Sequence, residues 1–392
     1  MTECSNNKKT SSCSDNHFPM RFDNMIQNCY EYACQARDAG RPIVGIMCEY
    51  TPRELIMAAG AVPVCLCGGS EEKIAPAEKD LPPGLCPLIK STYGYYCTQA
   101  NPFLEMADVI VAETTCDGKK KMYELMAERK EMYILELPQK PDDPDAKEHW
   151  FRELCKFRDF LRTRYNCTIS DDDLREAITT MNHERSLRRQ LAETMKQPQP
   201  HWSGRDLLNY KSIISGIQED MAEYQQLLDK PPQLSDQNGS PVRVLLTGVP
   251  TVHGAEKVID VIENAGGLIV CMENCTGLKP IIEDVSANGS NPLKAIAEKY
   301  FHLPCSVMTR NDGRIELLKQ LISEYRPDCI VDLIWQGCLT YDVEAFFVRE
   351  LAESLSIPYL KIVTDYSPSD SARIALRIEA LFETAQQSKV LK

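Results

Sequence analysis

Short apolar runs and segments with helical spacing alternate along two regions of the chain. In the first region, the apolar, β-branched run at 109–112 has the composition of a strand buried on both faces, and Met122, Leu125 and Met126 follow it at helical spacing. Such alternation predicts parallel sheets. Strands are expected at residues 42–48, 61–66, 109–112, 132–137, 242–247, 268–271, 328–334 and 359–363.

The segment between these two regions reads as mostly helical, highly charged and free of strand signals, from residue 146 to 228. Proline-rich stretches at 138–144 and 231–241 flank it, and residues 1–20 form a polar tail rich in Ser and Asn. We therefore expect an α/β fold of two Rossmann- or flavodoxin-like domains, with mostly parallel sheets, joined by a helical segment. The expected domains are 1–144, including the tail, 145–236 and 237–392.

One helix start is specified by local chemistry, at Thr51-Pro52-Arg53-Glu54. Thr51 is expected to cap the helix, with Pro52 as its first residue and Glu54 completing a capping box.

Composition narrows the class of protein. With 392 residues, 43% of them hydrophobic and 26% charged, the chain can bury a substantial core. The net charge of −13 argues against nucleic acid or an anionic membrane as a partner. No apolar run approaches the ~18 residues of a spanning helix, and the N-terminus lacks a signal peptide's apolar core. A cytoplasmic protein is expected.

Seventeen cysteines are unusual for such a chain and suggest metal ligation or redox chemistry. Cys116 follows the strand at 109–112 and precedes a helix, which is where open α/β sheets place ligands. The other candidates also lie in turns, three from each α/β region. The candidate set is Cys48, Cys86, Cys116, Cys275, Cys305 and Cys338.

The remaining cysteines have less informative positions. Cys4 and Cys13 lie in the polar tail and are expected to have no role. Cys65 and Cys67 lie at the end of a predicted strand and are expected either in the core or in contact with the ligand residues. Cys97 is expected to pack among aromatic residues, and Cys271 and Cys329 in the core.

Thiolates select zinc, Cu(I) or iron–sulfur clusters. The paired CxxC motifs of structural zinc are missing, and ligands supplied one per turn suit a cluster held in a cleft between two domains. The chain also lacks GxSxG, HExxH and GxGxxG motifs, and without a GxxxxGK[ST] motif any ATP must be hydrolysed by a partner. His253 is expected to be a satisfied surface histidine.

Several longer motifs occur in a fixed order between residues 40 and 385: CEYTPRELIMAAGAVPV, LCPLIKSTYGY, ETTCDGKKKMYE, ENCTGLK, PCSVMTRNDGR and TDYSPSD. Together they resemble the D-component of the 2-hydroxyacyl-CoA dehydratase and benzoyl-CoA reductase superfamily, and most of all its double-cubane cluster proteins. The resemblance implies one cubane on Cys86, Cys116 and Cys338, and a second on Cys48, Cys275 and Cys305.

The resemblance also implies an 8Fe–9S cluster, a homodimer, and a separate ATP-hydrolysing iron–sulfur protein that supplies low-potential electrons for reducing a small molecule. One alternative is a 2-hydroxyacyl-CoA dehydratase subunit with a single 4Fe–4S cluster, in which Cys48, Cys275 and Cys305 would not bind iron. Another is a non-catalytic electron carrier, which would need no open pocket beside the cluster. Cys65, Cys67, Cys97 or Cys271 can replace a ligand in any of these schemes.

A cluster in this place makes three structural demands. The six thiols should face one cavity, and the helix N-termini beside Cys48 (at Thr51), Cys116 and Cys338 should point at the cluster. Hydrogen bonds to the cluster are expected from the polar residues Glu113, Thr114, Thr115, Lys119 and Gln336. Asp365, Tyr366 and Ser367 are candidates for lining the approach of the substrate, and a simple helix cap is an equal alternative for Ser367 and for Asp370.

Overall fold

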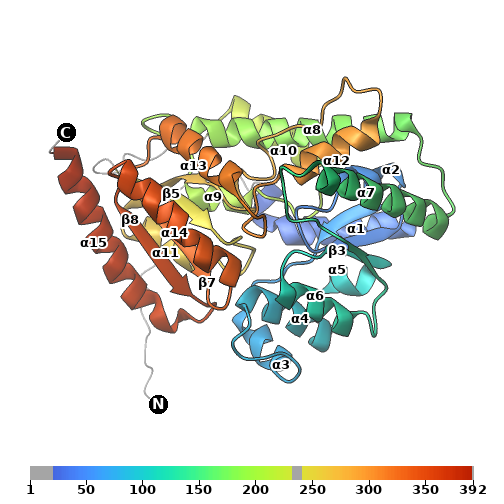
Figure 1. The fold of residues 1–392 in the computed structure, drawn as a ribbon, viewed down its shortest axis with the longest axis horizontal. Helices are drawn as coiled ribbons and strands as arrows, with labels where there is room; N and C mark the ends of the chain where they lie inside the picture. Colours follow the sequence, from blue (N-terminus) through green and yellow to red (C-terminus); the bar gives the residue numbers. More distant parts are fainter. Residues whose placement is uncertain (1–20, 232–240, 391–392) are drawn as a thin grey trace, which may run out of the picture.

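The computed structural model describes residues 21–231 and 241–390, and contains two four-stranded sheets in which every strand pairing is parallel (Figure 1). This confirms the expected α/β fold. The first sheet has the order β2-β1-β3-β4 and the second the order β6-β5-β7-β8. The strands are β1 (Ile43–Ile46), β2 (Val62–Cys65), β3 (Val109–Glu113), β4 (Met132–Leu135), β5 (Val242–Gly248), β6 (Gly267–Met272), β7 (Cys329–Trp335) and β8 (Tyr359–Thr364).

Helices connect the strands and fill the segment between the two sheets. In the first half they are α1 (Met25–Asp38), α2 (Arg53–Ala58), α3 (Ile74–Ala77), α4 (Pro87–Thr98), α5 (Pro102–Met106) and α6 (Asp117–Met126). In the sequence, four helices follow β4 and precede β5: α7 (Pro144–Tyr165), α8 (Asp171–Thr194), α9 (Gly204–Asn209) and α10 (Gln218–Asp229). In the second half they are α11 (Lys257–Asn264), α12 (Pro292–Phe301), α13 (Asp312–Tyr325), α14 (Leu339–Ser354) and α15 (Ser371–Val390). Short 3-10 helices lie at Arg21–Asn24, Glu71–Lys73 and Pro368–Asp370.

The division of the chain at residues 144 and 236 stays a prediction, and residue 236 lies outside the described residues, as do the tail and its Cys4 and Cys13. In the part of the chain that the structure describes, no helix is both long and apolar enough to cross a membrane.

The prediction of a capping box at the start of α2 was wrong. The helix begins at Arg53 with Pro52 at its cap position, and no side chain caps it. The Thr51 hydroxyl instead donates to the Glu113 carboxylate, and the Glu54 carboxylate accepts from Tyr300 at 2.7 Å. The side chains of Thr51 and Glu54 thus bond to buried partners that are distant in sequence. This outcome is favoured because leaving a buried carboxylate without a partner costs far more free energy than leaving a helix end uncapped.

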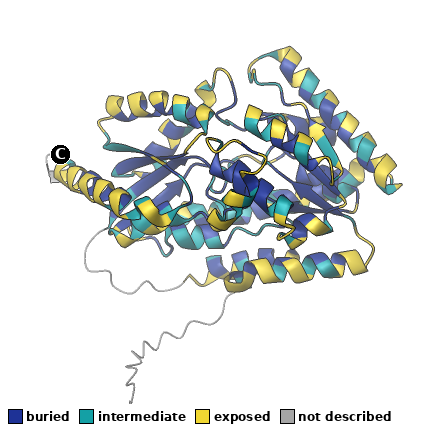
Figure 2. Cartoon of the chain, turned by 90° about the horizontal axis from the view of Figure 1, so that it is seen from below, coloured by how far each residue is buried: buried dark blue, intermediate teal, exposed yellow. Residues whose placement is uncertain are grey.

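Successive residues of β1 and β3 point to opposite faces of the first sheet. Val44 and Val111 pack in one core, and Ile43 and Ile110 pack in the other, as the two-residue period of a strand requires. Figure 2 shows these strands buried, with helices on either side whose outer faces are exposed. Charged residues on those outer faces account for the high charge that the sequence carries there.

One helix crosses from the second half of the chain to the first. α12 follows β6 in sequence but packs on α7 and α8, over the first sheet (Figure 1). Trp150 of α7 is fully buried there, with its ring centroid 6.4 Å from those of both Tyr50 and Phe301. This packing carries the turn after α12, which holds Cys305, to the ends of the first sheet's strands.

Both sheets reverse their strand order at a switch point, between β1 and β3 in the first and between β5 and β7 in the second. Adjacent connections leave in opposite directions at such a point, which opens a crevice at the carboxyl ends of the strands. Cys48 follows β1, Cys116 follows β3 and Cys338 follows β7, so three of the six candidate cysteines lie at the switch points.

The packing of α12 on α7 predicts a large effect of Trp150→Ala. Loss of this buried indole should lower the free energy of unfolding by about 3–5 kcal/mol, measured by urea denaturation. The neighbouring Arg152, whose side chain is 69% exposed, provides the control. Arg152→Ala should change stability by less than about 0.5 kcal/mol. Equal effects of the two substitutions would contradict the assigned packing.

Candidate functional site

Three of the six candidate cysteines occupy the cap position at the start of a helix. Cys86 precedes α4, Cys116 precedes α6 and Cys338 precedes α14, and none of the three caps its helix with a side-chain hydrogen bond. Their sulfurs thus remain available beside free backbone N–H groups and the positive end of each helix dipole. The helix starts predicted beside Cys116 and Cys338 are present, and that they point at a cluster stays a prediction. The helix start at Cys86 was not predicted, although the Cys-Pro pair signals it.

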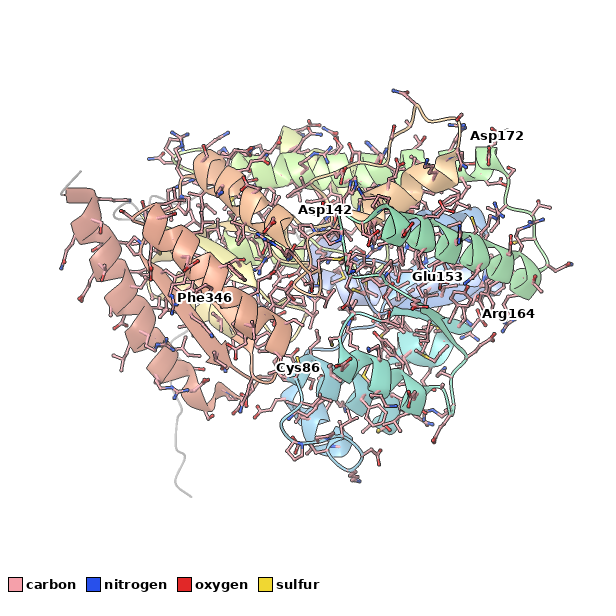
Figure 3. All side chains as sticks on the ribbon, in the orientation of Figure 1. Cys86, Asp142, Glu153, Arg164, Asp172 and Phe346 are labelled. Atoms are coloured by element: carbon pink, nitrogen blue, oxygen red, sulfur yellow. The ribbon has the colours of Figure 1, made fainter. Side chains whose placement is uncertain are left out.

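Electrostatic contacts divide the six thiols into two groups. In the first, the Cys86 group, Cys86 and Cys338 are in direct contact and Cys116 interacts with both. In the second, the Cys48 group, Cys48 interacts with Cys275 and Cys305, which also interact with each other. Cys116 and Cys305 interact between the groups. Figure 3 marks Cys86 where the helices of the first sheet meet the C-terminal strands and helices.

Backbone N–H groups stabilise negative charge in the Cys86 group. The neighbouring Cys338 thiol, and then the nearby N–H groups of Leu88 and Ile89, lower the pKa of the Cys86 thiol against the effect of burial. The same contact with Cys86, together with burial, raises the pKa of Cys338. One proton shared between two sulfurs explains the opposite directions.

A half-buried lysine, Lys119, interacts with thiols of both groups. Lys119 Nζ donates to the Met47 carbonyl at 2.7 Å and interacts with the thiols of Cys48, Cys67 and Cys116. Burial raises the pKa of the Cys48 thiol well above its usual value, and Lys119 opposes that shift. The prediction that Lys119 supports the site is consistent with this position.

More positive charge than negative charge surrounds the Cys48 group on the side of the first sheet. Glu49 pairs with Arg53 at 2.8 Å and with Lys211 at 2.9 Å, and these two cations hold the pKa of its carboxyl well below the usual range despite burial. Glu113, in contrast, is buried, and burial raises its pKa to about 7. Three cations, with Lys119 as the third, therefore face one fully ionised carboxylate. This environment suits an anion at the thiols.

Several buried polar atoms near the thiols have no hydrogen-bond partner within the described residues. Among them are Glu113 Oε2 and the hydroxyls of Tyr123, Thr251 and Tyr366. Tyr123 interacts with Cys48 and Cys67, and Tyr366 with Cys86 and Cys67. Because native proteins rarely leave buried polar groups unsatisfied, these atoms indicate a further group beside the thiols that accepts or donates hydrogen bonds.

A cavity of about 380 Å³ adjoins the Cys48 group and has walls from both α/β regions. Cys48 and Cys275 line it, and the other four candidate cysteines are not among its lining residues. Of those four, Cys86 is buried, and Cys116, Cys305 and Cys338 are half-buried. That all six thiols face one cavity stays a prediction. Polar lining is supplied by Glu49, Lys119, Lys211, Thr251 and His253, and apolar lining by residues that include Leu88, Tyr95, Phe103 and Val252.

Two further cysteines line the same cavity. Cys67 Sγ donates to the Met47 carbonyl at 3.3 Å, and Cys65 Sγ accepts from Arg53 at 3.5 Å. Both lie nearer to the candidate set than a packing role requires. Cys271, by contrast, is 2% exposed within β6, and Cys97 lies beside Tyr93 and Asp80, away from the cavity.

Other expected site residues have structural partners. Thr114 accepts from the Leu137 N–H, and Gln336 is exposed to solvent. Ser367 caps the 3-10 helix that follows it, so of the three residues after β8 only Tyr366 faces the thiols. His253 was expected at the surface, but it lines the cavity, with its Nε2 3.2 Å from the Lys211 carbonyl.

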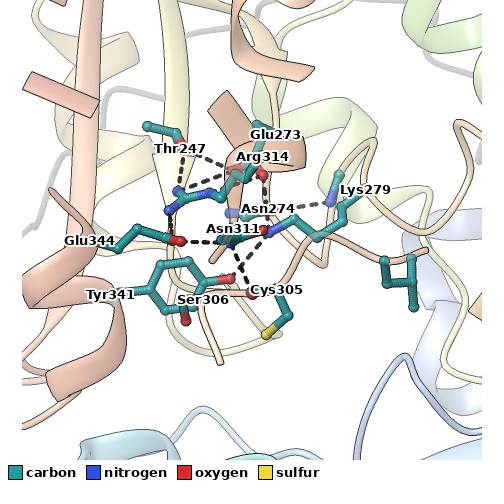
Figure 4. Close-up of polar contacts among 12 residues, drawn as sticks. Thr247, Glu273, Asn274, Lys279, Cys305, Ser306, Asn311, Arg314, Tyr341 and Glu344 are labelled. Atoms are coloured by element: carbon teal, nitrogen blue, oxygen red, sulfur yellow. Dashed lines mark hydrogen bonds and ion pairs between the residues drawn. The ribbon is translucent and has the colours of Figure 1, made fainter. Parts of the chain in front are cut away.

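A buried network that sequence reasoning missed supports the Cys48 group (Figure 4). The Lys279 Nζ pairs with Glu273 at 3.0 Å and contacts the Tyr341 hydroxyl at 3.2 Å. Arg314 pairs with Glu273 at 3.3 Å and also with Glu344. Only the spacing ENCTGLK, which places a lysine four residues after Cys275, offered a signal.

Asn311 links this network to a candidate ligand. Its side-chain amide donates to the Cys305 carbonyl at 2.9 Å and to Glu344 at 2.6 Å, which fixes the turn that carries the thiol. The Cys275 turn is fixed in a similar way, because Asn274 donates to the Val249 carbonyl at 3.0 Å.

The residues present fit an anionic iron–sulfur cluster. Nowhere in residues 21–231 and 241–390 do three His, Cys, Asp or Glu side chains lie close enough to hold a single metal ion. A cubane distributes its cysteines over separate irons, so its sulfurs need not approach each other as closely as the ligands of one ion. Thiol donors, excess positive charge and unpartnered hydroxyls all suit such a group. That these thiols bind iron stays a prediction.

Comparison with known proteins identifies the family. The family model described as 2-hydroxyglutaryl-CoA dehydratase, D-component, matches residues 48–385. The chain belongs to this family. The superfamily that the sequence motifs indicated is thus confirmed.

Three relatives illustrate the range of this superfamily. YjiM of Escherichia coli (strain K12), provisionally named a dehydratase subunit, is 37% identical over 93% of this chain and 96% of its own length. The (R)-phenyllactyl-CoA dehydratase beta subunit of Clostridium sporogenes is 20% identical over 93% of this chain and 97% of its own. A benzoyl-CoA reductase subunit of Thauera aromatica is 23% identical over 82% and 85%, respectively.

The raised pKa of Glu113 predicts a pH-dependent effect of Glu113→Gln in the metal-free protein. Between the ordinary value of 4.5 and about 7, the folded chain holds a proton that the unfolded chain releases. The unmodified protein therefore loses stability as pH rises through that window, and glutamine does not. The variant should gain about 3 kcal/mol relative to the unmodified protein between pH 4.5 and 7.5, measured by urea denaturation. A difference independent of pH would contradict this assignment.

Proposed function

We propose that this chain is the iron–sulfur component of an ATP-driven reductase. The two thiol groups would hold an 8Fe–9S double cubane, with Cys86, Cys116 and Cys338 on one half and Cys48, Cys275 and Cys305 on the other. A partner protein that hydrolyses ATP and carries its own iron–sulfur cluster would supply single low-potential electrons. The substrate would be a small molecule bound in the cavity beside Cys48 and Cys275.

The observation that carries this proposal is the arrangement of the six thiols. They come from six separate turns and interact in two groups of three, and Cys116 and Cys305 interact between the groups. Two joined cubanes need that division, since each takes three cysteines and shares a bridging sulfide with the other. Soft sulfur donors beside helix N-termini and buried cations also favour a negatively charged cluster.

The partner follows from the chemistry that this chain lacks. Its sequence has no phosphate-binding GxxxxGK[ST] motif, so ATP hydrolysis would take place in another protein. The relatives are named as subunits, which supports assembly with further chains. We also propose that two copies of this chain form a homodimer.

A second candidate function is that of a 2-hydroxyacyl-CoA dehydratase subunit with one 4Fe–4S cluster. The family match and the names of the relatives favour it. In that case the Cys86 group would bind the cluster, and the thiols of the Cys48 group would stay free. A non-catalytic electron carrier is less well supported, because a cavity of about 380 Å³ lies against Cys48 and Cys275.

Anaerobic purification with iron and sulfide counting distinguishes these functions. The double cubane predicts about eight irons per chain, and a large loss of iron in a Cys→Ala variant at each of the six positions. About four irons, unaffected by changes at Cys48, Cys275 or Cys305, would favour the dehydratase subunit. No bound iron would overturn both.

Three thiols outside the six provide one control variant and two further tests. Cys271→Ala, in the interior of β6, should keep its iron, whereas Cys65→Ala and Cys67→Ala test whether a cavity thiol replaces a proposed ligand. Substrate reduction should require the partner protein, a strong reductant and MgATP together. Activity of the isolated chain with ATP alone would contradict the proposed division of labour.

A further inference from the structure

Lys279 is a fully buried cation that lies against the Cys48 group. Its side chain is 1% exposed, and its ammonium interacts with the thiols of both Cys275 and Cys305. Lys279 lies four residues after Cys275 in the connection that follows β6, and its ammonium pairs with Glu273, two residues before Cys275, at 3.0 Å. A buried ammonium–carboxylate pair thus brackets Cys275 in the sequence and lies beside the Cys48 group.

Two further contacts hold Lys279 in this position (Figure 4). The Glu273 carboxylate is anchored by Thr247, whose hydroxyl donates to it at 2.7 Å, and by the guanidinium of Arg314. The Tyr341 ring lies beneath both cations, with Lys279 Nζ 5.5 Å and Arg314 Cζ 4.9 Å from its centroid. A lysine with so many fixed neighbours cannot turn away toward solvent.

The network around Lys279 is electrically balanced as a whole. Lys279 and Arg314 supply two positive charges, and Glu273 and Glu344 supply two negative charges. Removing any one of these charges therefore leaves a net charge of known sign beside the Cys48 group, in an interior where screening by solvent is weak.

The two thiol groups obtain their positive surroundings from different sources. The Cys86 group lies at the starts of three helices, whose N–H groups are part of the backbone. The Cys48 group has no cysteine at a helix cap and has two lysines beside it instead, Lys279, which is buried, and Lys119, which is half-buried. It is also the group that borders the cavity, through Cys48 and Cys275.

We propose that Lys279 is a positioning residue that sets the reduction potential of the cavity-facing half of the cluster, held toward it by Glu273 and Arg314. This inference rests on the proposed function. Lys279 keeps its proton throughout. Its charge stabilises one added electron, which leaves the iron–sulfur ATPase as that partner is oxidised by one electron. Electron density then accumulates at the Cys48 group, beside the substrate, and Lys279 does not touch the substrate itself.

Two substitutions of opposite sign test this role. Lys279→Met removes a positive charge at similar size, so the midpoint potential of the purified protein should shift to lower values in an anaerobic redox titration followed by electron paramagnetic resonance. Glu273→Gln removes the opposing negative charge, and the potential should shift to higher values. If the two substitutions acted only by loosening the packing, the midpoint potentials of the two variants would not be expected to shift in opposite directions.

Two milder variants complete the experiment. Tyr341→Phe removes the hydroxyl 3.2 Å from Lys279 but no charge, and should leave the direction of both shifts intact when combined with either variant. Lys257→Met removes a partly buried lysine that pairs with Asp370 at 2.7 Å, and should not change the potential.

The outcomes separate the two proposals. Iron content near that of the unmodified protein, with opposite shifts in the two charge variants, supports the role of Lys279. If Lys279→Met does not fold, the upward shift in Glu273→Gln alone still supports it. Unchanged potentials, or shifts in the same direction, would overturn the role of Lys279 while leaving the double cubane standing. An iron count of about four in the unmodified protein would overturn the proposed function itself.

Discussion

Thiols buried close together can carry negative charge only where fixed positive charge or hydrogen-bond donors surround them, because burial alone favours the neutral form. The structure meets this demand twice. Three helix N-termini meet at the Cys86 group, and the lysines Lys119 and Lys279 flank the Cys48 group. The positions of many other residues follow from this arrangement, since a buried lysine itself needs a carboxylate or carbonyl oxygen within reach.

The supporting contacts tie distant parts of the chain to one place. Arg314, on α13, bonds to Glu273 after β6 and to Glu344 on α14. Asn311 connects the same network to the turn that carries Cys305. A substitution at any of these residues therefore alters the surroundings of thiols from several elements, and the effects of such substitutions are not expected to be additive.

Two parallel sheets with the same strand order provide the frame. In each, the switch point opens a crevice at the carboxyl ends of the strands, and the cysteine turns lie there. The frame alone does not join the two crevices. α12 does so by packing on α7 and α8, which places Cys305 from the second half beside Cys48 from the first.

Local patterns in the sequence were sufficient to predict the α/β fold, the parallel sheets and the strand positions to within a few residues, because apolar runs and helical spacing are local signals. They also singled out the cysteines in turns, since thiol chemistry and a position after a strand can both be read from neighbouring residues. The tertiary structure decided which thiols meet, which of them border the cavity, and that Cys65 and Cys67 lie there too. It also decided that Thr51 and Glu54 bond to distant partners instead of capping α2, and that Lys279 and Arg314 are buried. These are long-range contacts, and no local pattern encodes the partner of a buried charge.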